Sequence, residues 1–258
     1  MIIYQAMIKF FRKIRQSLLS ENKFSKYIIY AIGEIILVVI GILIALQINN
    51  WNENRKSRNQ EKLYLNRLLS ENKEDLETFK NSVIDLEKGI ETVESLSKAL
   101  NNENSSDSLL VLAANDYFGY GSIYPIFTSS TSTFDDLSST GNLKDIQNSV
   151  LRDQLVKHYA LHKQVKERIR IGTDWALPLD APFTYQNSIM RFEPVSNYLF
   201  GQQSNKALAE HLRDKKDEYI NNAAAHLWIN KDAILQMEML IKETDKIITS
   251  IKRELKNQ

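Results

Sequence analysis

Two histidines of this chain have a spacing that could bind a metal ion. His158 and His162, in the stretch HYALH, lie one helical turn apart, as the two histidines of a zinc-binding helix do. A metalloprotease helix would also carry glutamate after the first histidine, and Tyr159 stands there instead. Because no third ligand lies nearby in the sequence, the pair is interpreted as two half-exposed helix histidines. The same interpretation applies to the isolated His211 and His226, so no metal site is predicted.

The residue types of other catalytic centres form no recognisable set. The chain contains no cysteine, which excludes disulfides, zinc–thiolate sites and cysteine nucleophiles. No G-x-S-x-G elbow, P-loop or dinucleotide-binding fingerprint occurs. The hydroxyl-rich run 129–133 fits turn and cap chemistry. The aromatic residues of 117–127 are expected to pack that loop on a bundle, with a ligand pocket as the alternative. The sequence therefore predicts neither an enzyme nor a bound cofactor.

The composition favours a helical protein that does not bind nucleic acid. Only 8 glycines and 4 prolines occur in 258 residues, which favours long helices over a turn-rich sheet protein. The formal net charge is +1. A nucleic-acid-binding domain would carry a clear basic excess, so nucleic acid is not expected as a partner.

One glutamate stands in an otherwise apolar run. Residues 27–47 read YIIYAIGEIILVVIGILIALQ, and Glu34 is the only charged residue among them. About 20 apolar residues are needed to cross a bilayer as a helix. A buried core helix and a cleavable signal peptide are alternatives, but the segment before the run is long and no A-x-A cleavage site follows it. The prediction is an uncleaved transmembrane helix over residues 27–48, with the lipid bilayer as its surroundings.

The glutamate shares one face of this predicted helix with small residues. Glu34, Val38, Gly41 and Ala45 fall on that face, and Gly41 with Ala45 forms a small-xxx-small pair that permits close approach of another helix. A carboxylate inside a bilayer costs about 2.5–3.5 kcal/mol on insertion scales. The hypothesis is that this face contacts another transmembrane helix, from the same protein or a different one. The alternative is that Glu34 reaches the cytoplasmic headgroups.

The basic residues on the two sides of the apolar run suggest an orientation. Six Lys and Arg residues precede it from position 9 onward, and five follow it within a comparable stretch. This weak positive-inside bias predicts a protein of the cell inner membrane, with residues 1–26 in the cytoplasm and residues 49–258 in the periplasm. Residues 1–26 are expected to form a basic amphipathic segment on the membrane surface. The pattern starts at Met7, which is therefore a second possible start residue.

The N-terminal quarter of the chain resembles a known family. The stretch IKFFRKIRQSLLSENKFSKYIIYAIGEIILVVIGILIALQINNWNENRK is similar to the start of a family of uncharacterised bacteroidete membrane proteins, described as a domain of unknown function. A weaker similarity continues in FDDLSSTGNLKDIQNSVLRDQLVKHY, residues 134–159. The resemblance implies a single-pass membrane protein with a helical soluble part. It brings no activity, cofactor or catalytic residue with it.

Beyond the apolar run the chain keeps long helical patterns. From Leu65 to Leu100 apolar residues recur at alternating spacings of three and four, which is typical of a coiled coil or an antiparallel bundle helix. Packing on later helices of the same chain is favoured over a stalk that joins identical chains. Further helices are expected over 108–118, 149–171, 204–216 and 218–256, with a loop over 119–133 and a proline break over 175–183. Thr133 with Asp136 predicts a capping box, and Gly141 predicts a C-terminal cap.

The predicted fold is therefore all-α, with one N-terminal transmembrane helix followed by a bundle of three or four long helices and an irregular loop inset. The preferred function is an interaction or scaffold component of a membrane complex. The alternative is a periplasmic ligand-sensing module that signals through a partner protein. A pocket lined by polar groups near residues 117–134 or 172–200 would favour sensing, whereas a smooth bundle with one exposed apolar stripe would favour scaffolding.

Overall fold

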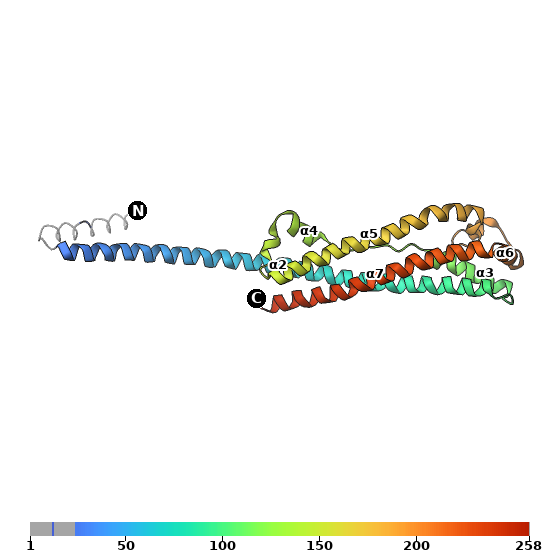
Figure 1. Ribbon diagram of the computed structural model, residues 1–258, viewed down its shortest axis with the longest axis horizontal. Coiled ribbons are helices and arrows are strands. Elements are labelled where there is room, and N and C mark those ends of the chain that lie inside the picture. The colour runs from blue at the N-terminus through green and yellow to red at the C-terminus, as the bar shows by residue number, and fades with distance from the viewer. Residues whose placement is uncertain (1–11, 13–23, 258) are drawn as a thin grey trace. The chain divides into compact units, whose positions relative to one another are not determined.

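The computed structural model describes Arg12 and residues 24–257, and within these residues it contains helices and no strand. The predicted all-α class is confirmed. Most of the expected amphipathic segment at 1–26 lies outside the described residues. Figure 1 shows the α-helices, whose bounds are α2 Phe24–Asn101, α3 Asp107–Asp116, α4 Ser132–Ser139, α5 Ser149–Gln186, α6 Asn205–Asp214 and α7 Lys216–Asn257. Four short turns complete the order: η1 Tyr117–Gly121, η2 Asn142–Asp145, η3 Ile189–Arg191 and η4 Asn197–Phe200.

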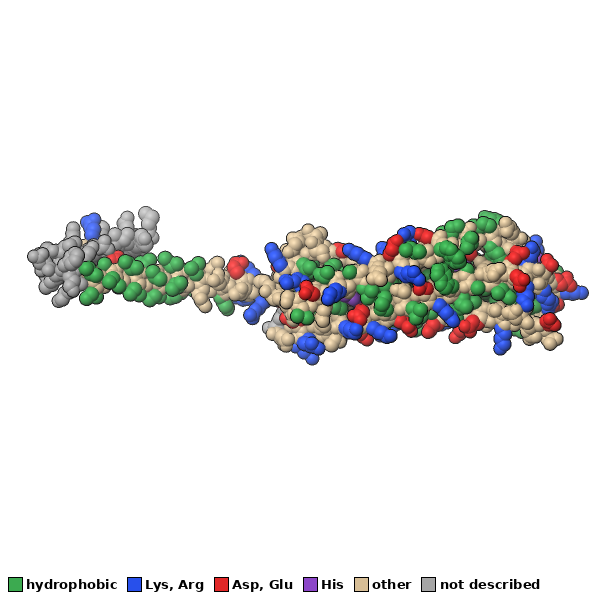
Figure 2. Space-filling view, in the orientation of Figure 1, with side chains coloured by type: hydrophobic (Ala, Val, Ile, Leu, Met, Phe, Trp, Pro, Cys, Tyr) green, Lys and Arg blue, Asp and Glu red, His purple; other side chains and the backbone are tan. Residues whose placement is uncertain are grey.

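The chain divides into two compact units, one up to Gln60 and one from Glu61 onward. In the first unit, α2 contains a stretch that is long and apolar enough to cross a membrane, and none of that stretch is buried inside the protein. Its side chains from Ile35 to Leu46 are exposed, and Figure 2 shows them as a continuous apolar surface. This stretch does not pack in the core of its own chain, as a buried core helix would.

In the second unit, α2 is one of three long helices that pack together. Figure 1 shows α5 and α7 running beside this part of α2, with α3 and α6 at one end of the three helices. The α2 residues Leu65, Phe79 and Val93 are buried, and each belongs to a cluster that includes residues of later helices. The repeating apolar stripe of α2 therefore packs within its own chain, as the bundle interpretation predicted.

The helices α5 and α7 run antiparallel. Arg168 of α5 forms an ion pair with Asp232 of α7, with its Nε 2.9 Å from the carboxylate oxygen Oδ2. Near the opposite ends of the pair, the Asn148 amide that caps α5 donates to Glu254 at 2.6 Å. Residue numbers thus rise along one helix as they fall along the other, which places the end of α5 beside the start of α7.

The prediction that prolines break the chain at 175–183 is wrong. Pro178 and Pro182 both lie inside α5, which continues to Gln186. Each proline removes one backbone hydrogen bond and costs about 3 kcal/mol in a helix interior. Tertiary contacts on either side of Pro178 offset that cost: Ala176 is fully buried, and Asp180 is hydrogen-bonded to α7. The helix therefore continues through both prolines because its packing and its hydrogen bonds to α7 stabilise it.

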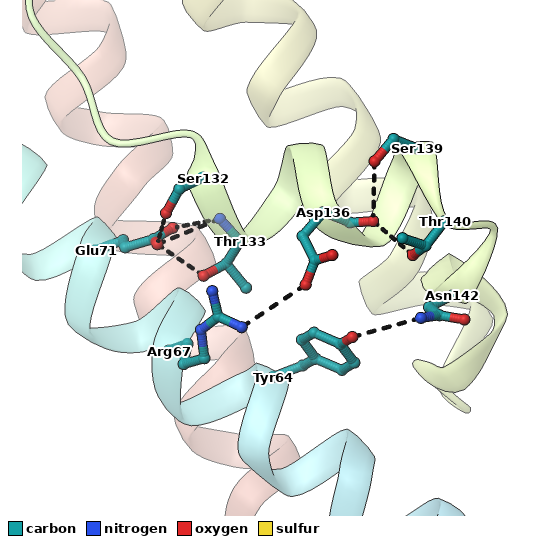
Figure 3. Close-up of polar contacts among 9 residues, drawn as sticks. All are labelled: Tyr64, Arg67, Glu71, Ser132, Thr133, Asp136, Ser139, Thr140 and Asn142. Carbon is teal, nitrogen blue, oxygen red and sulfur yellow. Dashed lines mark hydrogen bonds and ion pairs between the residues drawn. The ribbon is translucent and has the colours of Figure 1, made fainter.

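The predicted capping box at Thr133 is also wrong, since this residue lies inside α4 and is bonded to another helix. The Thr133 hydroxyl donates to the Glu71 carboxylate at 2.7 Å, and its backbone N–H donates to both Glu71 oxygens at 3.3 Å (Figure 3). The Ser132 hydroxyl donates to the same carboxylate at 2.6 Å. Thr131, at the N-cap position of α4, makes no capping hydrogen bond with its side chain. Glu71 of α2, far away in the sequence, accepts the hydrogen bonds at this helix start instead. The predicted C-terminal cap is confirmed, because Gly141 has a φ of 74°, in the left-handed region.

Two further α2 carboxylates hold the segment around α4. Glu61 accepts a hydrogen bond from the backbone N–H of Gln147 at 2.7 Å, and Asp75 accepts one from the backbone N–H of Ser130 at 2.7 Å. Because these bonds go to backbone groups, they fix the path of the segment rather than select its side chains. Arg67 of α2 adds an ion pair to Asp136 at 3.7 Å, also drawn in Figure 3.

Candidate functional site

A pocket of about 320 Å³ opens where the end of α5 meets α7 and the segment after α3. This volume lies at the lower end of the range for small-molecule sites. Apolar and aromatic side chains form much of its lining, and polar groups converge among them. The lining residues that matter for its chemistry are Phe118, Tyr124, Asp180, Glu193, Asn222 and His226.

The Asp180 carboxylate is the centre of the polar lining. Its Oδ1 accepts a hydrogen bond from the Asn222 amide at 2.7 Å, and its Oδ2 accepts one from His226 Nε2 at 2.9 Å. The Tyr124 hydroxyl donates a short hydrogen bond to the same Oδ2. Asn222 in turn accepts a bond from the Tyr117 hydroxyl at 2.7 Å. Three separate segments, namely α5, α7 and the loop after η1, are therefore joined through one carboxylate.

This network keeps Asp180 ionised. Burial alone would raise the pKa of its carboxyl, but the hydrogen bonds from His226, Tyr124 and Asn222 outweigh burial and lower it. The pKa of Tyr124 is raised by burial and by its bond to Asp180, so Tyr124 remains a donor. At Glu193, burial also opposes ionisation, and backbone N–H groups of Val195 and Ser196 lower the pKa of its carboxyl. The pocket thus carries two carboxylates, and neither Lys nor Arg lines it.

His226 lies in the pocket wall as an almost fully buried side chain. Its side chain is 1% exposed, and its ring packs near Tyr117 and Tyr124 with ring centroids 6.2 and 5.3 Å away. Its Nε2 donates to Asp180, which leaves Nδ1 as the second polar atom of the ring. Within the described part of the chain this buried Nδ1 has no hydrogen-bond partner. A buried polar atom without a partner costs free energy, so this wall of the pocket is not fully hydrogen-bonded within the described structure.

The two histidines singled out by their spacing are buried rather than half-exposed, so that part of the prediction is wrong. His158 is 3% exposed and His162 1% exposed, and both side chains of α5 contact α2. The Asn72 amide nitrogen donates to the Leu68 carbonyl at 2.8 Å and to the Tyr159 hydroxyl at 3.0 Å, so its oxygen accepts from His158 Nε2 at 2.8 Å. Asn72 thus fixes the His158 tautomer.

Burial keeps both histidines neutral. It lowers the pKa of His158 to about 4 and that of His162 to about 3, with the neighbouring His158 adding to the second shift. Neither ring nitrogen of His162 has a hydrogen-bond partner among the described residues. In residues 12 and 24–257, no group of three or more His, Cys, Asp or Glu side chains is arranged to hold a metal ion. The pair lies in the core of the bundle, where the His162 ring packs against Phe79 and Phe127 and the His158 ring against His162.

Replacing Asp75 with asparagine is expected to stabilise the bundle at pH 8 by about 1–2 kcal/mol. Burial, with Glu71 and Glu74 adding to it, raises the pKa of this carboxyl to about 6, and its Oδ2 has no partner in the described structure. A raised carboxyl pKa contributes stability that is present below about pH 4 and lost as pH rises through about 6. A pKa shift of this size limits the stabilisation by Asp75→Asn to about 3 kcal/mol. The expected stabilisation is smaller than this limit because the amide nitrogen of the new asparagine also lacks a hydrogen-bond partner.

Urea unfolding at pH 4 and pH 8 measures this effect. The two proteins should have nearly equal unfolding free energies at pH 4 and should differ at pH 8. The matched control is Glu87→Gln, which removes an exposed carboxylate from the same helix and should change neither value by more than about 0.5 kcal/mol. A variant that is destabilised equally at both pH values would contradict the prediction.

The four residues predicted to contact another transmembrane helix lie in the first unit, on the exposed part of α2. Val38, Gly41 and Ala45 are exposed, and a Cβ added at Gly41 would meet no atom within 4 Å. Glu34 is intermediate in exposure. The helical backbone there gives all four residues the common face that the sequence predicted. Contact of this face with another helix stays a prediction.

Sequence reasoning did not identify Asp180, Asn222 or His226 as a site. Two signals were present: Asn222 and His226 are four residues apart, which puts them on one face of a helix, and aromatic residues gather at 117–127. Asp180 lies in the stretch predicted to be a proline break, so no helix face was assigned to it. The aromatic loop does contribute Phe118 and Tyr124 to the pocket, which was the alternative interpretation of that loop.

Comparison with known proteins identifies a family and no function. No curated protein and no solved structure matches this chain. One family model, described as a family of unknown function, matches residues 34–166, just over half of the chain. The matched region contains the apolar stretch from Glu34, the α4 segment held by α2, and the first part of α5. Asp180, Asn222 and His226 lie beyond its end. This chain therefore belongs to the family of unknown function DUF6090.

Proposed function

We propose that this protein is a single-pass membrane protein whose helical bundle binds a small molecule and passes the bound state to a partner protein. The observation that carries this proposal is the pocket at the Asp180 network, which combines apolar lining with converging polar groups. Most of its lining comes from the two regions, 117–134 and 172–200, in which a pocket favours sensing, and Asn222 and His226 of α7 complete it. The bundle is proposed to have no catalytic activity of its own.

The position of the pocket supports a role in signalling. A ligand there would touch α5, α7 and the loop after η1 at once, because lining residues come from all three. Binding would therefore favour one arrangement of these elements over others. A ligand can shift such an equilibrium only by the difference between its affinities for the two arrangements. A partner protein that contacts the long helices would bind the two arrangements with different affinities and would thereby respond to the ligand.

The proposal is tested by measuring whether a small molecule co-purifies with the protein and whether its binding requires the pocket. Full-length protein purified from its native membrane should release a bound small molecule on denaturation, detected by mass spectrometry. Ala181→Trp places an indole in the pocket lining and should abolish the bound molecule. Ala224→Trp makes the same change at an exposed position of α7 outside the lining and should retain it. Equal recovery from both variants, or no small molecule from the wild type, would count against ligand binding.

The proposed location is the inner membrane, with the N-terminus in the cytoplasm and the bundle in the periplasm. The apolar stretch of α2 and the slight excess of basic residues before it support this orientation, and the resemblance to bacteroidete proteins supports the compartment. Because the chain has no cysteine, a single Asn102→Cys in the exposed turn after α2 gives a clean label site. A maleimide that cannot cross the inner membrane should label it in intact cells. Labelling only after the inner membrane is opened would reverse the orientation.

An interaction or scaffold role is a second candidate, and one surface of the bundle favours it. Trp175 of α5 and Trp228 of α7 are 52% and 51% exposed, with ring centroids 5.3 Å apart. Ile171 and Leu179 lie one turn before and after Trp175 and are also exposed. Figure 2 shows apolar side chains gathered over the C-terminal half of α5. Exposed apolar surface of this kind is typical of protein contacts, and the signalling partner could bind there.

The transmembrane face is expected to contact another helix. In this interpretation, Glu34→Leu weakens self-association or partner binding in native membranes severalfold, because it removes the one polar group of the apolar helix face. Crosslinking in membranes followed by gel analysis measures the change. Leu43→Ala is the matched control, since Leu43 lies on the opposite side of the helix and is exposed. An unchanged crosslinking pattern for Glu34→Leu would remove the hypothesis.

A further inference from the structure

We infer that the ligand of the Asp180 pocket is a small organic cation with an apolar body, such as an arylalkylamine. This inference rests on the proposed ligand-binding function and names the chemical class of the ligand. The sign of the charge in the pocket, the kind of hydrogen-bonding groups and the apolar lining each support it.

The charge of the pocket favours a cation. Asp180 and Glu193 contribute two carboxylates to the lining, while His226 is the one side chain there that could carry positive charge. Even a protonated His226 leaves the carboxylates in excess. Both carboxyl pKa values are lowered although burial opposes this, because hydrogen bonds within the protein stabilise the ionised forms. With two carboxylates and neither Lys nor Arg, the lining therefore carries net negative charge.

The hydrogen-bonding groups of the lining call for a donor. The two carboxylates of the lining, Asp180 and Glu193, are hydrogen-bond acceptors only. An ammonium group has donors and no acceptor, so it matches this set. An anionic ligand would bring further acceptors and further negative charge. A neutral ligand would leave the charge of the pocket without a counterpart.

The remaining lining supplies the binding surface for an apolar body. Phe118, Tyr124 and Phe183 contribute aromatic rings to the lining, and Leu177 and Met190 contribute aliphatic side chains. Aromatic faces attract cations by about 0.5–2 kcal/mol, more strongly when the site is partly dry. The volume of about 320 Å³ exceeds that of an inorganic ion or a bare ammonium ion by far. An amine attached to an aromatic or aliphatic group uses both the charge and the apolar surface.

Three indole compounds of nearly the same shape test the inference. Tryptamine is a cation, tryptophol is neutral and indole-3-acetate is an anion at pH 7. Binding of each is measured by isothermal titration calorimetry to the full-length protein in zwitterionic lipid nanodiscs, with empty nanodiscs as the blank. Tryptamine should bind at least tenfold more tightly than tryptophol, and indole-3-acetate more weakly still.

Two variants connect the preference to the pocket. Asp180→Asn should remove most of the tenfold preference for tryptamine over tryptophol. Glu193→Gln, which leaves the Asp180 network intact, should reduce the preference by a smaller factor and serves if the first variant folds poorly. Equal binding of tryptamine and tryptophol, or a preference for the anion, overturns the cation inference and leaves ligand binding standing. Binding of none of the three counts against the proposed function itself.

Discussion

Replacing Asp180 with alanine is expected to lower the free energy of unfolding of the bundle by about 3 kcal/mol. The change removes the acceptor of three donors, Tyr124, Asn222 and His226, two of which come from α7. A buried donor left without a partner costs about 1–3 kcal/mol. The sum is reduced because water can enter the pocket and because the Asp180 side chain is 21% exposed. Urea unfolding of the full-length protein, followed by the fluorescence of Trp175 and Trp228, measures the loss.

The pH dependence of this loss has a definite sign. The pKa of Asp180 is lowered in the folded protein, so its contribution to stability is present above the ordinary carboxyl pKa. That contribution disappears as pH falls through the lowered value. Wild type and Asp180→Ala should therefore differ most near neutral pH and converge in acid. The variant lacks the carboxylate, so this component of the acid unfolding is absent from it.

A control on the same helix separates the network from a general effect of charge. Asp174 of α5 forms an exposed ion pair with Arg170, and its side chain is 55% exposed. Exposed pairs contribute about 0–1 kcal/mol, so Asp174→Ala should change stability by less than about 0.5 kcal/mol. If Asp174→Ala and Asp180→Ala lost the same stability, the Asp180 network would have no special role in holding α5 to α7.

Replacing Phe79 with alanine should cost about 3–5 kcal/mol, the largest loss expected from one apolar residue of α2. Phe79 is 1% exposed and stacks on Phe127 with ring centroids 5.5 Å apart. Its ring also packs edge-to-face with the His162 ring, with ring centroids 5.6 Å apart. Removing a fully buried aromatic ring loses its burial and leaves a cavity that the surrounding helices fill only in part. Urea unfolding monitored by circular dichroism at 222 nm measures the effect.

The same experiment distinguishes a bundle from a coiled coil between chains. Ile84 lies on the exposed side of α2, and Ile84→Ala should cost less than about 0.5 kcal/mol. Because Phe79 packs within its own chain, the unfolding midpoint of wild type and variant should not depend on protein concentration. A midpoint that rises with concentration would indicate that identical chains stabilise this helix instead.

The all-α class and most helix positions could be predicted from the sequence because they depend on local patterns. The scarcity of glycine and proline, the apolar stripe from Leu65 to Leu100 and the turn-rich stretch after Asn101 each depend on neighbours in the chain. The structure has α2 ending at Asn101 and α7 at Asn257, close to the predicted ends. Such patterns constrain local structure because propensity and periodicity act over a few turns.

Residues whose environment comes from distant segments were predicted poorly. Pro178 and Pro182 appeared to end α5, but α7 holds the helix through Asp180. Thr133 appeared to cap α4, but Glu71 provides the cap from α2. In each case a contact between residues far apart in the chain outweighed a local preference.

By itself, the sequence determined the apolar helix that begins before Glu34, the absence of cysteine chemistry and the helical class, because length, composition and period are local properties of the chain. Only the tertiary structure decided that His158 and His162 are core residues and that Asp180, Asn222 and His226 meet in one pocket. These three residues are separated by up to 46 positions. They come together because α5 and α7 pack antiparallel. Which face of α7 meets the end of α5 depends on the packing of the whole bundle, not on the local sequence of either helix.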